Sequence, residues 1–199
     1  PNLKVGDYLF VSKYSYGFSR HSFPFSIPLI PGRIFYNEPK RGEIVVFKTP
    51  EDNRTDYIKR LIGLPGDTIR IDSNEIFINN KKILRESINT EKYKYFDVDR
   101  IKEILPNKYF YDVYEFKKQI VDLNTNNLNE IKVPKDNFFV LGDNRDNSQD
   151  SRFIGFIPKK NLVGRAELVF VSFDTEIGSF LKFWTWFPAL RKDRFLVDL

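Results

Sequence analysis

The chain has 199 residues, of which 41% are hydrophobic and 30% charged, with 20 Phe, 10 Tyr and a formal net charge of +5. The composition is that of a globular protein, its aromatic content favours β structure, and the length suits one medium-sized domain or a core with a sizeable insertion. The absence of cysteine excludes disulfides, thiolate metal sites and a cysteine nucleophile, and no Lys/Arg block marks a nucleic-acid-binding tail.

The N-terminal part of the chain predicts a strand followed by an irregular ribbon. Residues 5–14 are a β-branched and aromatic run after a Gly-Asp turn. Residues 17–43 carry many Pro and Gly, which block a helix or a central strand, so an excursion or an edge ribbon is expected. His21 is expected in a solvated loop of this ribbon, which argues against imidazole catalysis. The ribbon's apolar tip would pack on the body or enter a membrane interface; it comprises Phe23, Phe25, Ile27, Leu29 and Ile30.

The remaining segments predict mostly strands, with one segment of different character. Residues 43–67 predict an antiparallel hairpin, and the tight alternation of residues 68–83 predicts two short strands around a Ser73-Asn74 turn. Residues 84–130 are rich in Lys, Glu, Tyr and Asn and predict an inserted subdomain with short helical pieces at 97–105 and 114–121. Strand and turn signals then return, with a closing strand at 164–173 and an aromatic segment at 180–188.

The chain contains no methionine, not even at position 1, so we expect it to be a fragment of a longer protein. No apolar run reaches the roughly 18–20 residues of a membrane-spanning helix. Any such helix, or a signal segment, is expected upstream of Pro1.

Lys59 stands in a strand pattern beside Tyr57 and Leu61, on a face that should be half-buried. One interpretation is a salt bridge to Asp56 or Asp67. The other is an amine kept neutral by apolar neighbours, acting as general base for a hydroxyl nucleophile. The second requires roughly 4–5 kcal/mol of desolvation to hold the lysine deprotonated near pH 7. A Ser–Lys pair needs neither His nor Cys, in agreement with the composition.

The polar loop GDNRDNSQDSR at 142–152 predicts a turn held by internal pairs such as Asp150–Arg152. A calcium loop is excluded by spacing. Counting from Asp143, the sixth position is Ser148 instead of Gly, and the twelfth is Ile154 instead of Glu. The loop therefore gathers hydroxyl and carboxylate groups without a metal site.

Three long motifs resemble the signature sequences of the bacterial type I signal peptidases, in the family's order and with the family's insertion between the second and third. They are residues 1–17, 41–67 and 142–158, and the ribbon at 22–35 is also similar. The resemblance implies a mainly β fold: coiled antiparallel β-sheets of the signal peptidase type with an inserted α+β cap subdomain. The catalytic core would comprise residues 1–71 and 134–199, and the cap residues 72–133.

The resemblance also implies the roles of individual residues. Lys59 falls on the family's general base, and Ser148 on the hydroxyl that hydrogen-bonds and orients it. Charged residues that match the positions bracing the site are Asp143, Arg145, Asp150 and Arg152, with Arg60 as a partner of one of the aspartates. By similarity, the pocket for the first residue before the cut would be lined by Leu3, Tyr57 and Ile58, and the pocket for the third by Leu9 and Val46.

The family's nucleophilic serine lies three residues before the position of Pro1, so we expect this fragment alone to be inactive. The implied activity is that of a Ser–Lys endopeptidase without metal or cofactor, which removes signal peptides from exported proteins. The implied partners are those signal peptides and membrane phospholipid. The implied location is the bacterial cytoplasmic (inner) membrane, with the catalytic domain on its outer or periplasmic side.

Two other functions stay open from the sequence. A non-catalytic β-rich homologue could bind peptide or lipid with Lys59 in a structural salt bridge, and an upstream sequence without a Ser-Met dipeptide would favour it. A self-cleaving repressor of the related Ser–Lys type would need a helix-turn-helix, which residues 1–199 do not supply.

Overall fold

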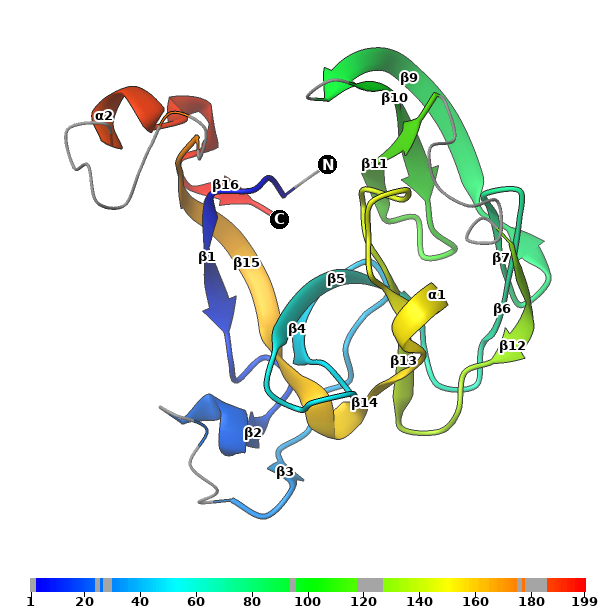
Figure 1. Ribbon diagram of the computed structural model, residues 1–199. Helices are drawn as coiled ribbons and strands as arrows, with labels where there is room; N and C mark the ends of the chain where they lie inside the picture. Colours follow the sequence, from blue (N-terminus) through cyan, green and yellow to red (C-terminus); the bar gives the residue numbers. More distant parts are fainter. Residues whose placement is uncertain are drawn as a thin grey trace.

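The computed structural model describes residues 3–23, 26, 30–93, 96–117, 127–174, 177 and 186–199. Its largest unit is a seven-stranded sheet in the order β1-β15-β4-β5-β13-β14, with β16 paired to β15 (Figure 1). All pairings within this sheet are antiparallel. Its strands are β1 (Asp7–Ser12), β4 (Ile44–Lys48), β5 (Asp56–Gly63), β13 (Asn137–Leu141), β14 (Ile157–Pro158), β15 (Leu162–Ser172) and β16 (Val197–Asp198).

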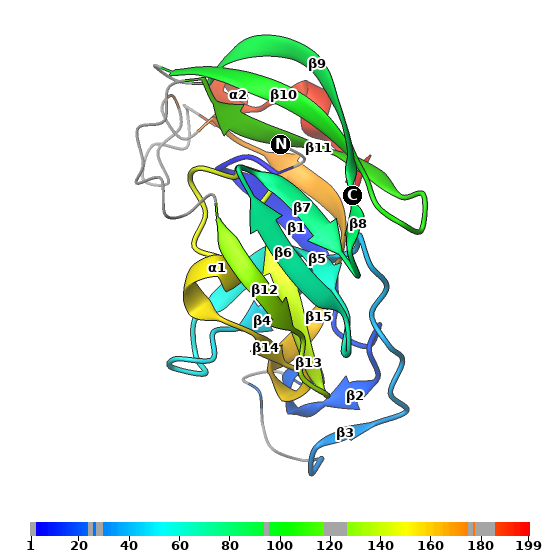
Figure 2. The ribbon, with the colours of Figure 1, turned by 90° about the vertical axis from the view of Figure 1, so that its right-hand side faces the viewer.

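Three smaller antiparallel sheets surround it. Two of them are formed mainly by the inserted segment (Figure 2). One has the order β12-β6-β7-β8, from β6 (Thr68–Asp72), β7 (Glu75–Ile78), β8 (Lys81–Lys82) and β12 (Leu128–Lys132). The other has the order β11-β10-β9, from β9 (Leu84–Tyr93), β10 (Phe96–Ile104) and β11 (Phe110–Phe116). The third sheet is the ribbon pair β2 (Phe18–Ser19) and β3 (Arg33–Ile34).

Short helical turns complete the fold: α1 (Ser151–Ile154), α2 (Trp186–Ala189), and 3-10 turns at Arg20–Ser22, Lys159–Asn161 and Lys192–Arg194. Within the described ranges, no helix is long and apolar enough to cross a membrane.

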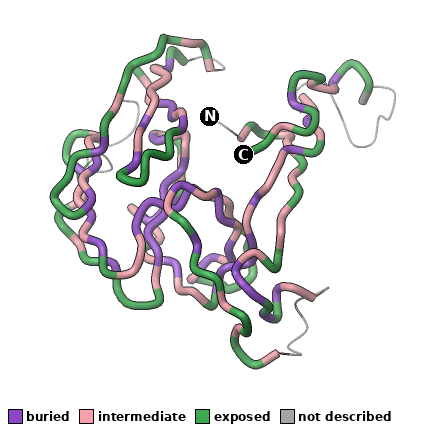
Figure 3. Tube along the Cα trace, turned by 180° about the vertical axis from the view of Figure 1, so that it is seen from behind, coloured by how far each residue is buried: buried purple, intermediate pink, exposed green. Residues whose placement is uncertain are grey.

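Two hydrophobic clusters hold the sheets together, and buried residues concentrate where β4, β5 and β13 meet (Figure 3). The alternation of side chains along a strand explains this burial. Every second residue faces the same side, and the first cluster accordingly contains Ile69, Ile71, Ile76 and Ile78. The second cluster includes Val45, Phe47, Leu61, Phe138 and Val140. The turn between β6 and β7 has positive φ at both Ser73 and Asn74, as a tight two-residue hairpin requires.

The expected strands and the mainly β class are confirmed, but the helical pieces of the cap are wrong. Residues 97–104 lie in β10, the middle strand of its sheet, and residues 114–116 lie in β11. The i, i+3 spacing of Val98, Ile101 and Ile104 favours a helix. In β10 it instead supplies apolar side chains to both faces of a strand that has neighbours on both sides. The cap is therefore β rather than α+β over its described residues.

The division into a core (1–71 and 134–199) and a cap (72–133) stays a prediction. β6, which belongs mostly to the expected core, pairs with β12 of the expected cap.

His21 is the second correction, because it is buried instead of solvated, with 2% of its surface exposed. It lies in the 3-10 turn that Ser19 caps, and its Nδ1 is 3.3 Å from Ser26 Oγ. Burial among positive charges lowers its pKa to about 4. Of the expected apolar tip, Phe25, Ile27 and Leu29 lie outside the described residues, as do residues 180–185 of the aromatic C-terminal segment.

Candidate active site

Lys59 lies in β5 directly opposite Val45 of β4, and residues that face each other in an antiparallel pair share one side of the sheet. Its side of the hairpin therefore also carries Phe47, Tyr57 and Leu61, which belong to or pack against the second hydrophobic cluster. The sequence interpretation placed Tyr57 and Leu61 beside Lys59, and the structure agrees. The Lys59 side chain therefore lies at the edge of an apolar core.

The salt bridges expected as the alternative for Lys59 are not formed. Asp56 pairs with Lys48 and Asp67 with Arg41, each at 2.8 Å. Among the described residues, the Lys59 amine has no hydrogen bond or ion pair, and its recorded contact is the Tyr57 ring at 5.6 Å.

Burial therefore dominates the protonation of Lys59. Desolvation lowers its pKa below the ordinary value of 10.5; Arg152 lowers it further, while Asp150 and Asp143 act in the opposite direction. An amine of lowered pKa without a carboxylate partner is suited to accept a proton.

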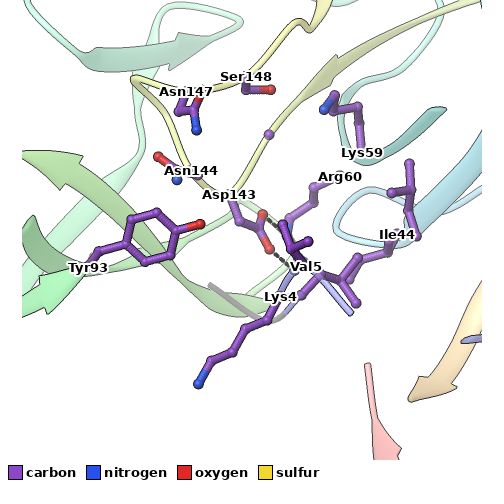
Figure 4. A pocket seen from close by; sticks show the side chains of 13 residues that line it. Lys4, Val5, Ile44, Lys59, Arg60, Tyr93, Asp143, Asn144, Asn147 and Ser148 are labelled. Atoms are coloured by element: carbon purple, nitrogen blue, oxygen red, sulfur yellow. Dashed lines mark hydrogen bonds and ion pairs between the residues drawn. The ribbon is translucent and has the colours of Figure 1, made fainter. Parts of the chain in front are cut away.

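Ser148 shares a cavity of about 310 Å³ with Lys59. Figure 4 shows the Lys59 amine and the Ser148 hydroxyl pointing toward one another across it. The hydrogen bond expected between them is absent from the structure, and Ser148 Oγ is a buried oxygen without a partner among the described residues. Gly142 makes this position possible: a β-carbon on Gly142 would lie 2.1 Å from Ser148 Oγ.

The charged residues predicted to brace the site form buried ion pairs around the 142–152 loop. Arg60 donates from Nε and Nη2 to the two carboxylate oxygens of Asp143, at 2.8 and 2.7 Å, and from Nη1 to the carbonyl of Gly42. Burial alone would lower the pKa of Arg60, but the Asp143 carboxylate reverses this and raises it. The expectation that Arg60 pairs with one of the aspartates is confirmed.

Asp150 organises the other end of the loop. Its carboxylate accepts hydrogen bonds from the Gly142 N–H at 3.0 Å and from Arg152 Nε at 2.9 Å, and it caps α1. The predicted Asp150–Arg152 pair is thus confirmed. Since Asp150 binds the backbone of Gly142, it fixes the residue against which Ser148 packs.

Arg145 has a partner that the sequence interpretation missed. Its guanidinium forms a bidentate ion pair with Glu103 of β10, with one contact of 2.5 Å from Nη1 to Oε1. Glu103 is fully buried. The sequence contains little that would predict this role of Glu103, because Glu103 is one of several charged residues in a segment that we expected to be helical.

The cavity contains some of the predicted substrate-binding residues. Leu3 and Ile58 line it, whereas Tyr57, Leu9 and Val46 do not. Val46 lies directly opposite Ile58, and Leu9 lies on β1 opposite Val169 of β15.

The cavity is also lined by residues that the sequence did not predict. They include Tyr93 of the cap and the loop residues Asn144 and Asn147 (Figure 4).

Comparisons with known proteins identify relatives of this chain. Residues 1–171 match the model of the family described as signal peptidase, peptidase S26. The chain is 42% identical to signal peptidase I of Rickettsia felis, with 97% of this chain and 78% of that protein aligned. It is 41% identical to signal peptidase I of Rickettsia typhi, covering 97% of this chain and 79% of the relative. A crystal structure of a signal peptidase I from Enterococcus faecalis matches 65% of this chain and 97% of its own, at 26% identity and a TM-score of 0.39.

The sequence matches carry the assignment, because they extend over nearly the whole chain and include the β5 hairpin and the 142–152 loop. These are the two segments that bring Lys59 and Ser148 into one cavity. The chain therefore belongs to the signal peptidase family, peptidase S26.

Proposed function

We propose that this chain is the catalytic part of a membrane-associated serine endopeptidase that cleaves signal peptides with a Ser–Lys dyad. Lys59 is the general base, Ser148 orients it, and the nucleophile is a serine three residues upstream of Pro1. The observation that carries the proposal is the state of Lys59: a desolvated amine with lowered pKa, without a carboxylate partner, in the cavity that also holds Ser148.

The substrate would bind as an extended strand beside β5. β13 pairs with β5 at Arg60, Leu61 and Gly63, so among the described strands residues 56–59 have a neighbour on the β4 side alone. An extended peptide can add to such an open edge through main-chain hydrogen bonds, with alternate side chains entering pockets. This edge leads directly to Lys59, and Leu3 and Ile58 line the adjoining cavity. Tyr57, Leu9 and Val46 remain candidates for the pockets further along the bound peptide.

The Lys59 amine would carry out each proton transfer of the reaction. Neutral Lys59 takes the proton of the serine hydroxyl as that oxygen attacks the scissile carbonyl, and it then gives the proton to the leaving amine. It next takes a proton from water as the water oxygen attacks the ester carbonyl of the acyl-enzyme, and it returns that proton to the serine oxygen as the ester bond breaks. Asp143 and Asp150 contribute by holding the loop that carries Ser148, through their bonds to Arg60 and Gly142.

The proposed membrane surface lies on β1 and β15, which run side by side away from the body toward α2 (Figure 1). Exposed aromatic rings contact one another on this surface: Phe10 of β1 packs edge to face on Phe170 of β15 with ring centroids 5.1 Å apart, and Phe195 lies 6.1 Å from Phe170. Aromatic side chains favour the interface between lipid and water. Co-sedimentation with anionic vesicles tests this: the F10S/F170S variant should lose binding, while F110S, which removes an exposed ring of the cap, should keep it. Equal binding by both would contradict the proposal.

The enzymatic proposal is tested with the full-length protein from the parent gene. Incubation with a preprotein should release a signal peptide by cleavage after small residues, detected by mass spectrometry. Lys59→Ala should abolish cleavage, and Ser148→Ala should reduce it by loosening the base. Cleavage that survives Lys59→Ala, or a full-length protein that cleaves no preprotein, would overturn the proposal.

A further inference from the structure

We propose that Glu103 of the cap is a positioning residue for the peptidase reaction, because its carboxylate clamps the loop that carries Ser148. The inference rests on the proposed function and extends it by giving part of the cap a role in the chemistry of the core.

The Glu103 carboxylate is at the centre of a buried charge network. Besides Arg145, it forms an ion pair with Arg85 of β9 at 3.2 Å and accepts a hydrogen bond from the Tyr111 hydroxyl at 2.7 Å. Arg85 also binds Glu115 of β11, so the two carboxylates and the two guanidinium groups balance in charge. Burial alone would raise the pKa of Glu103, but the surrounding donors, Arg145 foremost, keep it lowered, so the group is ionised at neutral pH. An ionised, fully buried carboxylate strongly orients the groups that neutralise it.

The network reaches the cavity by two routes. In the first, Arg145 bridges from Glu103 to the carbonyl of Gly142, to which its Nε donates at 3.3 Å. Gly142 packs directly against Ser148.

In the second route, the Tyr111 ring lies under the Arg60 guanidinium at 4.3 Å, and Arg60 forms an ion pair with Asp143. Gly142, Asp143 and Ser148 all line the cavity of Lys59.

The backbone reinforces the same connection. The loop after β13 lies along β11, where the Tyr114 N–H donates to the Asp143 carbonyl at 2.8 Å and the Arg145 N–H to the Tyr114 carbonyl at 2.9 Å (Figure 1). The Phe116 N–H donates to the Asp146 carboxylate at 2.7 Å. The loop that carries Ser148 is thus joined to the edge of the cap sheet by a single parallel bridge between Tyr114 and Asn144, and Glu103 binds the Arg145 side chain of the same loop.

The test replaces Glu103 by Gln in the full-length enzyme, with Asp112→Asn as the matched control. Both changes turn a paired carboxylate of this sheet into an amide. Asp112 follows Tyr111 in β11, so it faces the opposite side of the sheet, where it binds Arg100. Glu103→Gln should lower kcat about 10- to 100-fold, because Ser148 loses its position, with KM within about twofold, because the β5 edge is unchanged. Asp112→Asn should keep the kcat of the wild type.

Two further measurements distinguish positioning from a mere loss of folded protein. Besides burial, which has the largest effect, the charged groups that shift the pKa of Lys59 are Asp150, Asp143 and Arg152. A loosened loop admits water to the amine, so the acid limb of kcat/KM should move to higher pH in Glu103→Gln. Hydrogen exchange at the amides of Tyr114 and Arg145 should accelerate in Glu103→Gln and stay unchanged in Asp112→Asn.

The outcomes separate the two proposals. If wild-type protein cleaves nothing, the proposed function fails, while hydrogen exchange still tests the clamp. If Glu103→Gln does not fold, Glu103→Asp replaces it, which keeps the charge but shortens its reach, and an intermediate loss of kcat with faster exchange is expected. A folded variant at Glu103 with wild-type kcat, acid limb and amide exchange would overturn the inference.

Discussion

Replacing Asp143 by Asn tests how much the fold depends on the ion pair beneath the candidate active site. The substitution keeps the shape of the side chain and removes its charge. Arg60 is then left with 1% of its side chain exposed, its bond to the Gly42 carbonyl and its contact with the Tyr111 ring. The guanidinium cannot release its proton to escape burial, so the charge stays uncompensated.

The expected loss follows from the geometry. Two unit charges about 4 Å apart attract by about 4 kcal/mol at an effective dielectric constant of about 20. Removing one partner of a buried pair costs about 3–5 kcal/mol in other proteins. Because 11% of the Asp143 side chain is exposed, we expect the low end, about 3 kcal/mol of the free energy of unfolding. For a chain of this length that corresponds to a fall in Tm of roughly 6–12 °C.

Urea unfolding followed by circular dichroism measures this loss without any need for activity. The matched control is Asp56→Asn, which breaks the Lys48 pair on the same hairpin, where Asp56 is 56% exposed. Such surface pairs contribute about 0–1 kcal/mol. A loss below about 1 kcal/mol for Asp143→Asn, or equal losses for both variants, would refute the claim that the buried Arg60 charge is compensated by Asp143.

Three further predictions concern Lys59, Gly142 and His21. Lys59→Met should abolish cleavage yet raise the free energy of unfolding at neutral pH, and this gain should shrink as pH rises toward 10.5, where the unfolded lysine also becomes neutral. Gly142→Ala should lower kcat about 10- to 100-fold with KM nearly unchanged, because the new methyl group displaces Ser148. The wild type should lose up to about 3 kcal/mol of its free energy of unfolding as pH falls from 6.5 to about 4. The His21→Gln variant should not show this loss. In that range the unfolded histidine takes up a proton and the buried one does not.

Each of these has a contradicting result. A stability gain of Lys59→Met that is constant or grows up to about pH 10 would mean that the amine is not desolvated. Wild-type kinetics for Gly142→Ala would mean that Ser148 can move without consequence. Parallel pH–stability curves for wild type and His21→Gln would place the histidine in solvent.

Local signals were sufficient to predict the strands that hold Lys59. The β4–β5 hairpin and the β6–β7 turn follow from alternation and from turn residues a few positions apart, so neighbouring sequence determines them. The cap strand β10 could not be predicted in this way. Its apolar spacing favours a helix, and the pairing with β9 and β11 overrides that preference.

The candidate site shows the same limit. Lys59 and the Asp150–Arg152 pair were predictable, because an unusual residue type or a short spacing marks them in the sequence. The contact between Glu103 and Arg145 joins positions 42 residues apart, and nothing local distinguishes Glu103 from the other acidic residues of the cap. The burial of His21 depends likewise on tertiary packing and not on its polar neighbours.

The central claim is that Lys59 is a desolvated amine, and an NMR titration of the lysine side chains tests it most directly. Following the Cε and Nζ signals of selectively labelled lysine, assigned through Lys59→Met, gives its pKa in the folded chain without requiring the nucleophile. We predict that Lys59 titrates below the ordinary value of 10.5, because burial disfavours its charged form. A Lys59 that titrates at 10.5 or above would contradict the account.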